Sequence, residues 1–342
     1  MAREFYKGPS SYVVYAEDTA FGTAGTPSAS NRIGRIQSAS WTIENNFIIV
    51  NGCGEGRNAS VALPGMVDVS GSISFNVDAF DIFEYFIGEK SGSGGVADPY
   101  EIAEADFIGY GAGLIPTLTL EFGEKGVTTD ATQVIDGVFF ENFTINANKG
   151  EAITCDCSFK GRYMAASASI ETYSAPTLRP YTFVDGTVTV GSDTAKVKSF
   201  SMTHDAGYAS DGEVGSRYIV QPVAGQRRYT FSITMFFTND DTASTLSGVE
   251  MMGLALGGLS TSTSTSDVAE FASAGTLSLD LIEGSATDDR VVNIDLENVY
   301  ITNVSPTIEV SGGAIEMTVS GIALAGLSDS TDNVPIRWYT IA

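Results

Sequence analysis

The chain has 342 residues, with 42 acidic side chains against 18 basic ones and a formal net charge of −24. A surface this acidic repels phosphate groups, which excludes a protein that grips nucleic acid electrostatically. Met1 to Phe5 carries charges with no apolar core behind it, and the longest aliphatic run is too short to cross a bilayer, so we expect neither a signal peptide nor a transmembrane segment.

The first 32 residues combine strand-like aromatic pieces with turns rich in Gly, Ser, Pro and Ala. This mixture predicts an extended N-terminal arm that straps onto a neighbour. Over the whole chain Val, Ile, Phe, Tyr, Thr, Ser and Gly dominate and long helical runs are missing, which predicts an all-β fold.

Residues 67–77 alternate strictly between apolar and polar, which predicts a strand with one packed and one wet face. The pattern returns at 229–237, about 160 residues later, and further matches extend over nearly the whole chain. Examples are Thr117-Leu118-Thr119-Leu120 with Thr276-Leu277-Ser278-Leu279, Phe140-Glu141-Asn142-Phe143 with Leu296-Glu297-Asn298-Val299, and Gly150 to Ser158 with Gly312 to Ser320. We therefore predict two tandem copies of one β-sandwich, residues 1–172 (copy 1) and 173–342 (copy 2).

A long connection follows the first matched strand of each copy, from Glu44 to Pro64 and from Asp205 to Ala224. Connections of this length are uncommon and are often functional, and apolar residues on them indicate a docking surface. The sequence therefore predicts a docking surface made by the apolar residues of both connections: Phe47, Ile48, Ile49, Val50, Tyr208, Tyr218, Ile219 and Val220.

A helix of about three turns is expected after the 67–77 strand, capped by Asp78 and ending at Gly88. Its counterpart is expected from about Asp240 to Met252. Low-complexity tracts follow both helices and predict mobile loops, and the segment from Ala166 to Pro180 is the expected boundary between the copies.

Catalytic chemistry has little support, because His204 is the only histidine and no nucleophile motif accompanies it. The Gly52, Gly54 and Gly56 spacing lacks the Lys-Ser/Thr pair of a phosphate-binding loop. Acidic clusters at 240–241, 288–289 and 329–332 lack the ligand pattern of a calcium loop, and Cys155 and Cys157 are expected to be small core residues. We therefore predict no enzyme activity, no cofactor and no metal.

Several patterns together resemble the tail tube proteins of tailed phages and archaeal viruses. They are Tyr15-Ala16-Glu17-Asp18 with Phe21-Gly22-Thr23-Ala24, the long loop, the Gly71 to Val77 strand, and a capped helix ending in Phe86-Ile87-Gly88. The resemblance implies a β-sandwich whose sheets join around a ring of six tube domains. It also implies that rings stack through long loops into a hollow tail tube that delivers viral DNA, in a virion made in the host cytoplasm.

Two tube domains per chain predict a ring of three chains with approximate sixfold symmetry, whose partners are further copies, other tail proteins and DNA that passes without binding. Six chains with copy 2 as an outer decoration is the competing arrangement. Two other functions remain open, a surface-layer or capsid-decorating β protein and a glycan-cleaving spike. The acidity fits either simple solubility or a halophilic habitat, where salt screens the self-repulsion.

Overall fold

The fold is that of a computed structural model, which describes residues 8, 11–28, 30–50, 61–103, 116–126, 130–167, 177–191, 193–238, 245–255, 275–284, 289–308, 314–324 and 336–340. Strands dominate these residues, and the two α-helices among them, α1 (Glu84–Ile87) and α2 (Gly248–Ala255), are short. The predicted all-β fold is therefore confirmed. No helix in the described ranges is long and apolar enough to span a membrane.

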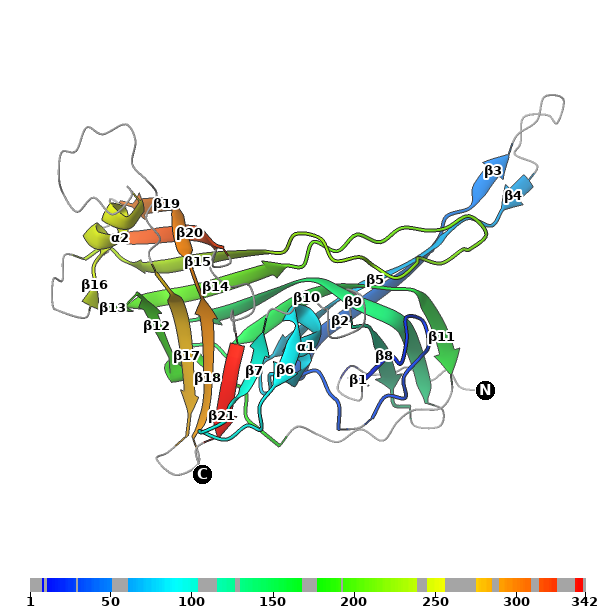
Figure 1. Cartoon of the computed structure of the whole chain (residues 1–342), viewed down its shortest axis with the longest axis horizontal. Coiled ribbons are helices and arrows are strands. Elements are labelled where there is room, and N and C mark those ends of the chain that lie inside the picture. The colour runs from blue at the N-terminus through cyan, green and yellow to red at the C-terminus, as the bar shows by residue number, and fades with distance from the viewer. Residues whose placement is uncertain are drawn as a thin grey trace.

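One large sheet of eleven strands runs through both copies (Figure 1). Eight of its strands follow one path, with four from copy 2 followed by four from copy 1. In order they are β19 (Val299–Thr307), β20 (Glu316–Ala323), β15 (Arg228–Phe236), β14 (Val197–Asp205), β9 (Ala131–Asn148), β10 (Thr154–Gly161), β5 (Val67–Asn76) and β2 (Arg35–Asn45). The first half of the long strand β9 also pairs with β8 (Leu118–Glu124) and β11 (Tyr163–Ser167), and β8 pairs with β1 (Ser11–Glu17).

A second sheet also combines strands of both copies. Its order is β16 (Thr245–Leu246), β13 (Asp193–Ala195), β12 (Gly186–Val190), β17 (Leu277–Glu283), β18 (Arg290–Leu296), β21 (Ile336–Thr340), β7 (Tyr100–Ala103) and β6 (Glu89–Ser91). The first six strands come from copy 2 and the last two from copy 1. The copies are thus joined twice, by β9 to β14 and by β7 to β21.

The strand registers correspond at matched positions of the two copies. Cys155 and Cys157 lie opposite Phe75 and Ile73 in copy 1, and their counterparts Met317 and Val319 lie opposite Met235 and Ile233. The register between β2 and β5 shifts after Ile36, and that between β14 and β15 shifts after the corresponding Val197. A shared bulge is a stronger sign of common structure than shared alternation, because it fixes one position in each strand.

One sequence match was wrong. Asn142 lies opposite Ser158 and Asn303 lies opposite Ser320, so the counterpart of Asn142 is Asn303 rather than Asn298. Asn298 instead sits between β18 and β19 with a φ of 46°, in the left-handed region that Asn tolerates. The sequence match paired Glu297-Asn298 at this turn with the identical dipeptide Glu141-Asn142 in β9, although the two do not occupy corresponding positions.

The N-terminal segment is a core strand in this structure, where the sequence suggested an extended arm. β1 pairs with β8, and Val13 and Tyr15 are buried. The buried carboxylate of Asp18, just after β1, accepts hydrogen bonds from Thr117 Oγ1 and the Gly137 backbone N, both at 3.0 Å. These contacts hold the end of the strand in place.

Both helices differ from their expected limits. The segment after β5 forms a 3-10 turn, η2 (Asp81–Phe83), followed by the four-residue α1, and Asp78 is not its cap. Helix α2 begins later than expected, where Ser247 and Glu250 form a reciprocal cap: the Ser247 backbone N donates to Glu250 Oε2 at 2.7 Å and the Glu250 backbone N donates to Ser247 Oγ at 3.2 Å.

A single apolar cluster extends across the two copies. The ring centres of Phe83 and Phe143 of copy 1 lie 5.4 Å apart, and the ring centre of Phe143 lies 5.1 Å from that of His204 in copy 2. Phe80 likewise lies 6.3 Å from Trp338. The two copies therefore share one core.

Candidate assembly surfaces

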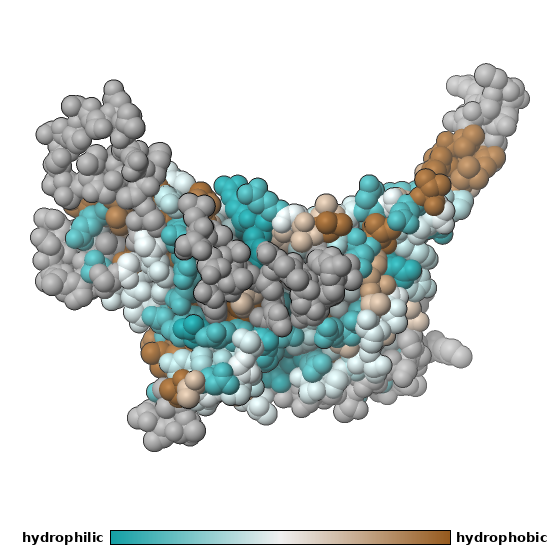
Figure 2. Space-filling view, in the orientation of Figure 1, coloured by the Kyte–Doolittle hydropathy of each residue, from teal (hydrophilic) through white to brown (hydrophobic). Residues whose placement is uncertain are grey.

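A narrow hairpin projects beyond the body of copy 1 from the ends of β2 and β5 (Figure 1). It is formed by β3 (Ile48–Val50) and β4 (Val61–Leu63), and we call it, together with Phe47, the arm. Phe47 is 61% exposed and Ile49 is 63% exposed, and Figure 2 shows the arm as the most continuous apolar region on the face in view. An exposed apolar surface on an extended hairpin indicates an assembly contact.

The arm is apolar on both of its faces. Directly paired residues of an antiparallel hairpin point to the same side, and successive residues alternate. The pairs Ile48–Leu63 and Val50–Val61 therefore share one face, while Ile49–Ala62 and Phe47 lie on the other. Each face needs a partner to be buried.

The corresponding hairpin of copy 2, residues 206–225, is already docked. Tyr208 packs against Phe139 of copy 1 at a ring distance of 6.0 Å, and burial raises its pKa. Tyr218 packs against Tyr163 at 5.5 Å and lies under the Arg162 guanidinium. Two of the four predicted interface residues of copy 2, Tyr208 and Tyr218, thus contact copy 1 of the same chain.

Backbone hydrogen bonds complete this docking. The Ala206 backbone N donates to Glu141 O at 2.9 Å, and the Val67 backbone N donates to Arg217 O at 2.8 Å. Arg217 also donates to Gly65 O at 2.9 Å. Ile219 bridges to Gly212, and the Val220 backbone N bonds Asp211 O within the hairpin.

The eight-strand path of the large sheet ends in two open edges among the described strands, β2 at one end and β19 at the other. Ile43 on β2 is 37% exposed, whereas its counterpart His204 on the paired strand β14 is 2% exposed. Val304 on β19 is half-buried, whereas its counterpart Phe143 on β9 is fully buried. A long edge of unpaired backbone groups is a template for another strand. Neither edge could be predicted from the sequence, because local alternation of apolar and polar residues does not reveal the order of strands in a sheet.

The large sheet has one face that carries mainly hydroxyl and amide side chains. Ser40 and Ser72 hydroxyls lie 2.9 Å apart, as do those of Thr144 and Thr203 across the joint between the copies. Lys160 and Lys198, which lie along this face, are each paired with a glutamate, Glu141 and Glu316 respectively. Other members of this surface are Ser38, Thr42, Ser70, Ser74, Asn142, Asn146, Ser158, Ser199, Ser201, Thr230, Ser232, Thr234, Asn303, Ser305, Thr318 and Ser320.

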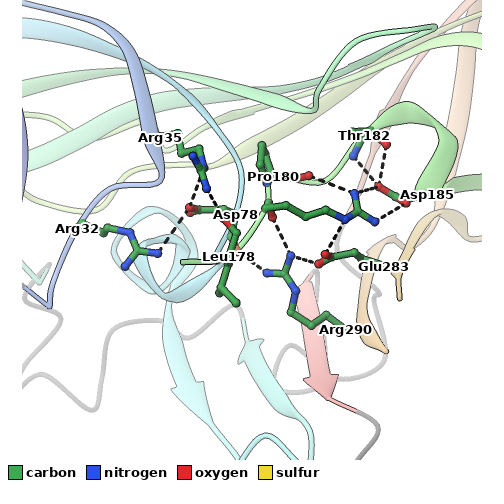
Figure 3. A network of polar contacts seen from close by, with 10 residues as sticks. Arg32, Arg35, Asp78, Leu178, Pro180, Thr182, Asp185, Glu283 and Arg290 are labelled. Carbon is green, nitrogen blue, oxygen red and sulfur yellow. Dashed lines mark hydrogen bonds and ion pairs between the residues drawn. The ribbon is translucent and has the colours of Figure 1, made fainter. Parts of the chain in front are cut away.

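Copy 1 and copy 2 are also connected by a network of ion pairs around the buried Asp78 carboxylate (Figure 3). Arg32 and Arg35 of copy 1 approach the fully buried Asp78 carboxylate at 3.6 and 3.8 Å. Arg290 of copy 2 donates to Asp78 O at 2.8 Å and pairs with Glu283, which also pairs with Arg179 at 2.6 Å. Burial raises the pKa of Asp78, and the two arginines oppose that rise.

The segment that links the copies belongs to the same network. Arg179 donates to both carboxylate oxygens of Asp185 at 2.9 and 3.0 Å, and Arg35 donates to Leu178 O at 2.7 Å. Burial alone would raise the pKa of Asp185, but hydrogen bonds from Arg179 and Thr182 hold it below its usual range. These bonds tie the linking segment to both copies.

The sequence features with possible chemistry take structural positions or fall outside the described residues. His204 lies between the Phe143 and Tyr229 rings, and burial, with a smaller effect from Arg227, lowers its pKa to about 3. Burial raises the pKa of both Cys155 and Cys157 thiols. The Gly52 to Gly56 turn and the acidic clusters, apart from Asp289, lie outside the described residues. In the described ranges no three His, Cys, Asp or Glu side chains are grouped to hold a metal ion.

Comparison with known proteins gives one family. A family model described as "Phage tail tube protein" matches residues 8–281, more than half of the chain and parts of both copies. Among solved structures, a chain of "Cryo-EM structure of the anti-feeding prophage (AFP) baseplate, 6-fold symmetrised" is 12% identical with a TM-score of 0.31, and the match covers 49% of this chain and 98% of that chain. None of the curated proteins matches this chain.

Proposed function

This chain belongs to the phage tail tube protein family, a family of structural proteins, and on that premise we propose that it assembles into stacked rings that form a hollow tail tube. Viral DNA would pass through the lumen during infection. The partners are other copies of the chain and other tail proteins, and the site of action is the virion tail.

The joint between the copies supports ring closure. In β9 and β14, Phe143 lies opposite His204 and Thr144 opposite Thr203. The open strands carry the counterparts of these residues: Ile43 and Thr42 on β2, and Val304 and Ser305 on β19. We propose that β2 of one chain pairs with β19 of the next in this same register.

The chemistry of the open edges fits that register. Thr42 would meet Ser305, which reproduces the hydroxyl pair of Thr203 and Thr144, and Ile43 would meet Val304 in an apolar pair. Trp41 would meet Pro306, which lacks an N–H, so this joint has at most one hydrogen bond fewer than its template. Between Ile36 and Ile43 the β2 edge carries no charge to discourage pairing.

This pairing favours three chains per ring. The two copies of one chain already lie side by side in one sheet, as two adjacent places of a ring would require. An arrangement of six chains with copy 2 as an outer decoration would leave the β9–β14 joint without a role in the wall. A heterologous contact that repeats around an axis closes into a ring, which also removes the open edges.

We propose that the hydroxyl and amide face of the large sheet lines the lumen. The opposite face is in the shared core, so this is the face that a closed wall would present to its interior. Its lysines Lys160 and Lys198 are already neutralised by glutamates. A surface with few free cations does not hold phosphate groups, so DNA can slide past it.

The arm is proposed to contribute to contacts between stacked rings, as the apolar residues of the sequence predicted. Its counterpart in copy 2 contacts copy 1, so the larger unpartnered apolar surface is that of copy 1. Electron microscopy of the purified protein at high salt tests the proposed function. Hollow tubes are expected, whereas protein that remains monomeric at every salt and protein concentration would contradict it.

A further inference from the structure

The arm of copy 1 and the docked hairpin of copy 2 are the same structural element in two settings. The first rung of the arm is Ile48–Leu63, and the corresponding rung of the copy 2 hairpin is Ala209–Val223. Phe47 follows β2 at the position where Tyr208 follows β14. The copy 2 hairpin lies across copy 1, whose strand β9 pairs with β14. Among the described residues of a single chain, no strand pairs with β2 on the corresponding side.

We propose that the face of the arm that carries Phe47 and Ile49 straps across copy 2 of the adjacent chain in the same ring. The opposite face, with Ile48, Val50, Val61 and Leu63, is then left for the next ring of the stack. This inference rests on the proposed ring, and it assigns one partner to each apolar face. The lateral strap is a contact between two copies of this chain.

The intrachain docking names the residues that receive the strap. Tyr208 packs against Phe139, which lies opposite Lys160, and the counterpart of Phe139 is Tyr300, which lies opposite Ile322. Phe47 therefore packs against Tyr300 of the adjacent chain. By the same correspondence the Asn45 backbone N donates to Thr302 O, as the Ala206 backbone N donates to Glu141 O.

Burial in the single chain agrees with this assignment. On the acceptor side, Tyr300 is half-buried and Leu324, whose backbone N donates to Asn298 O next to the start of β19, is 50% exposed. On the donor side, Phe47 is 61% exposed. Apolar side chains are thus exposed at both surfaces that the duplication brings together, while Tyr208 and Phe139, their counterparts inside one chain, cover each other.

A cross-linking experiment with three cysteine pairs tests the strap. Each pair is placed in the full chain with Cys53→Ser, since Cys155 and Cys157 are buried. The strap pair is Phe47→Cys with Tyr300→Cys, the edge pair is Ile43→Cys with Val304→Cys, and the template pair, within one chain, is Phe139→Cys with Tyr208→Cys. A short bismaleimide is added under conditions that give tubes, and products are separated on a denaturing gel.

The expected result is that the template pair links within monomers, while the strap and edge pairs both give covalent species up to a closed trimer. If the edge pair links chains and the strap pair leaves monomers, the strap is wrong and the ring stands. If neither pair links chains while the template pair reacts, the ring and the strap are both wrong. If the strap pair alone links chains, the lateral strap is supported and the proposed β2–β19 joint is contradicted.

Discussion

At the residue scale, each copy pairs one glycine with one phenylalanine at the same position of two adjacent strands, but the two residues exchange strands between the copies. In copy 1, Gly71 on β5 lies opposite Phe159 on β10; in copy 2, Phe231 on β15 lies opposite Gly321 on β20. A Cβ at Gly71 would lie 2.3 Å from Phe159 Cζ, and a Cβ at Gly321 would lie 2.4 Å from Phe231 Cζ. One ring therefore fills the space of two side chains in each copy.

This packing predicts that Gly71→Ala destabilises the fold by about 1–3 kcal/mol, because a methyl group is forced into a filled space. In a Phe159→Ala background the cost is smaller but not zero, since Ser40 O also lies 2.4 Å from the added Cβ. Denaturant titration of the four variants in this cycle measures both effects. Gly95→Ala, at a site with nothing within 4 Å, is the control, and equal stability of Gly71→Ala and Gly95→Ala would contradict the packing argument.

His204 makes the joint between the copies sensitive to acid. Its pKa is about 3 in the folded chain, whereas an unfolded histidine titrates near 6.5. As the pH falls below about 6.5, the unfolded chain takes up a proton that the folded chain does not, so the free energy of unfolding decreases by about 1.4 kcal/mol per pH unit.

His204→Ile, which places the residue found at the counterpart position Ile43, is expected to remove this dependence. Between pH 7 and pH 5 the unmodified chain should lose about 2 kcal/mol more stability than the variant, measured by chemical denaturation. The carboxylates titrate in both proteins and therefore cancel in the difference. Identical losses in the two proteins would show that His204 is not held neutral by burial.

At the element scale, the arm is the part of the chain whose burial depends on assembly. Ile48→Asp places a charge on the face assigned to the next ring, so we expect single rings that do not stack. Ile49→Asp places it on the face assigned to the adjacent chain, so we expect fewer rings, and the double variant should remain folded without forming tubes. Negative-stain microscopy and sedimentation distinguish these states.

Val184→Asp is the matched control for the arm variants. Val184 is an aliphatic side chain that is 87% exposed, and it precedes β12, far from the arm. This variant should assemble as the unmodified chain does. Normal tubes from the Ile48→Asp and Ile49→Asp double variant would contradict both assigned faces.

Local residue patterns predicted individual strands better than they predicted which strands pair with each other. The alternation in 67–77 and 229–237 predicted β5 and β15, because a strand with one buried face alternates between apolar and polar residues. β1 was missed as a core strand because its role depends on pairing with β8, more than a hundred positions away. The arm residues were found as exposed apolar side chains, but the docking of Tyr208 on Phe139 required knowledge of which copy lies beside which strand.

At the scale of the whole molecule, the two copies act as one body with shared sheets and a shared core. The ionic network around Asp78 and Arg290 joins both copies and the segment between them. These shared sheets and contacts are consistent with the two copies occupying two adjacent positions in one ring. Nothing in the sequence alone predicted that both sheets would continue from one copy into the other.

The net charge of −24 per chain predicts that assembly depends on salt. Bringing chains together in rings concentrates like charges, and salt screens them over a Debye length of about 10 Å at 0.1 M. Light scattering should therefore show assembly that rises with ionic strength, in line with a halophilic habitat. A flat or falling response would count against this interpretation of the acidity.

The number of chains in one ring decides whether both copies of each chain occupy places in the tube wall. An averaged end-on view of tubes made by the full chain should show three chains, with sixfold repetition of the inner wall and only threefold repetition of the outer surface. Three chains would mean that the β9–β14 joint within a chain and the β2–β19 joint between chains alternate around the wall. Six full chains per ring would contradict this account.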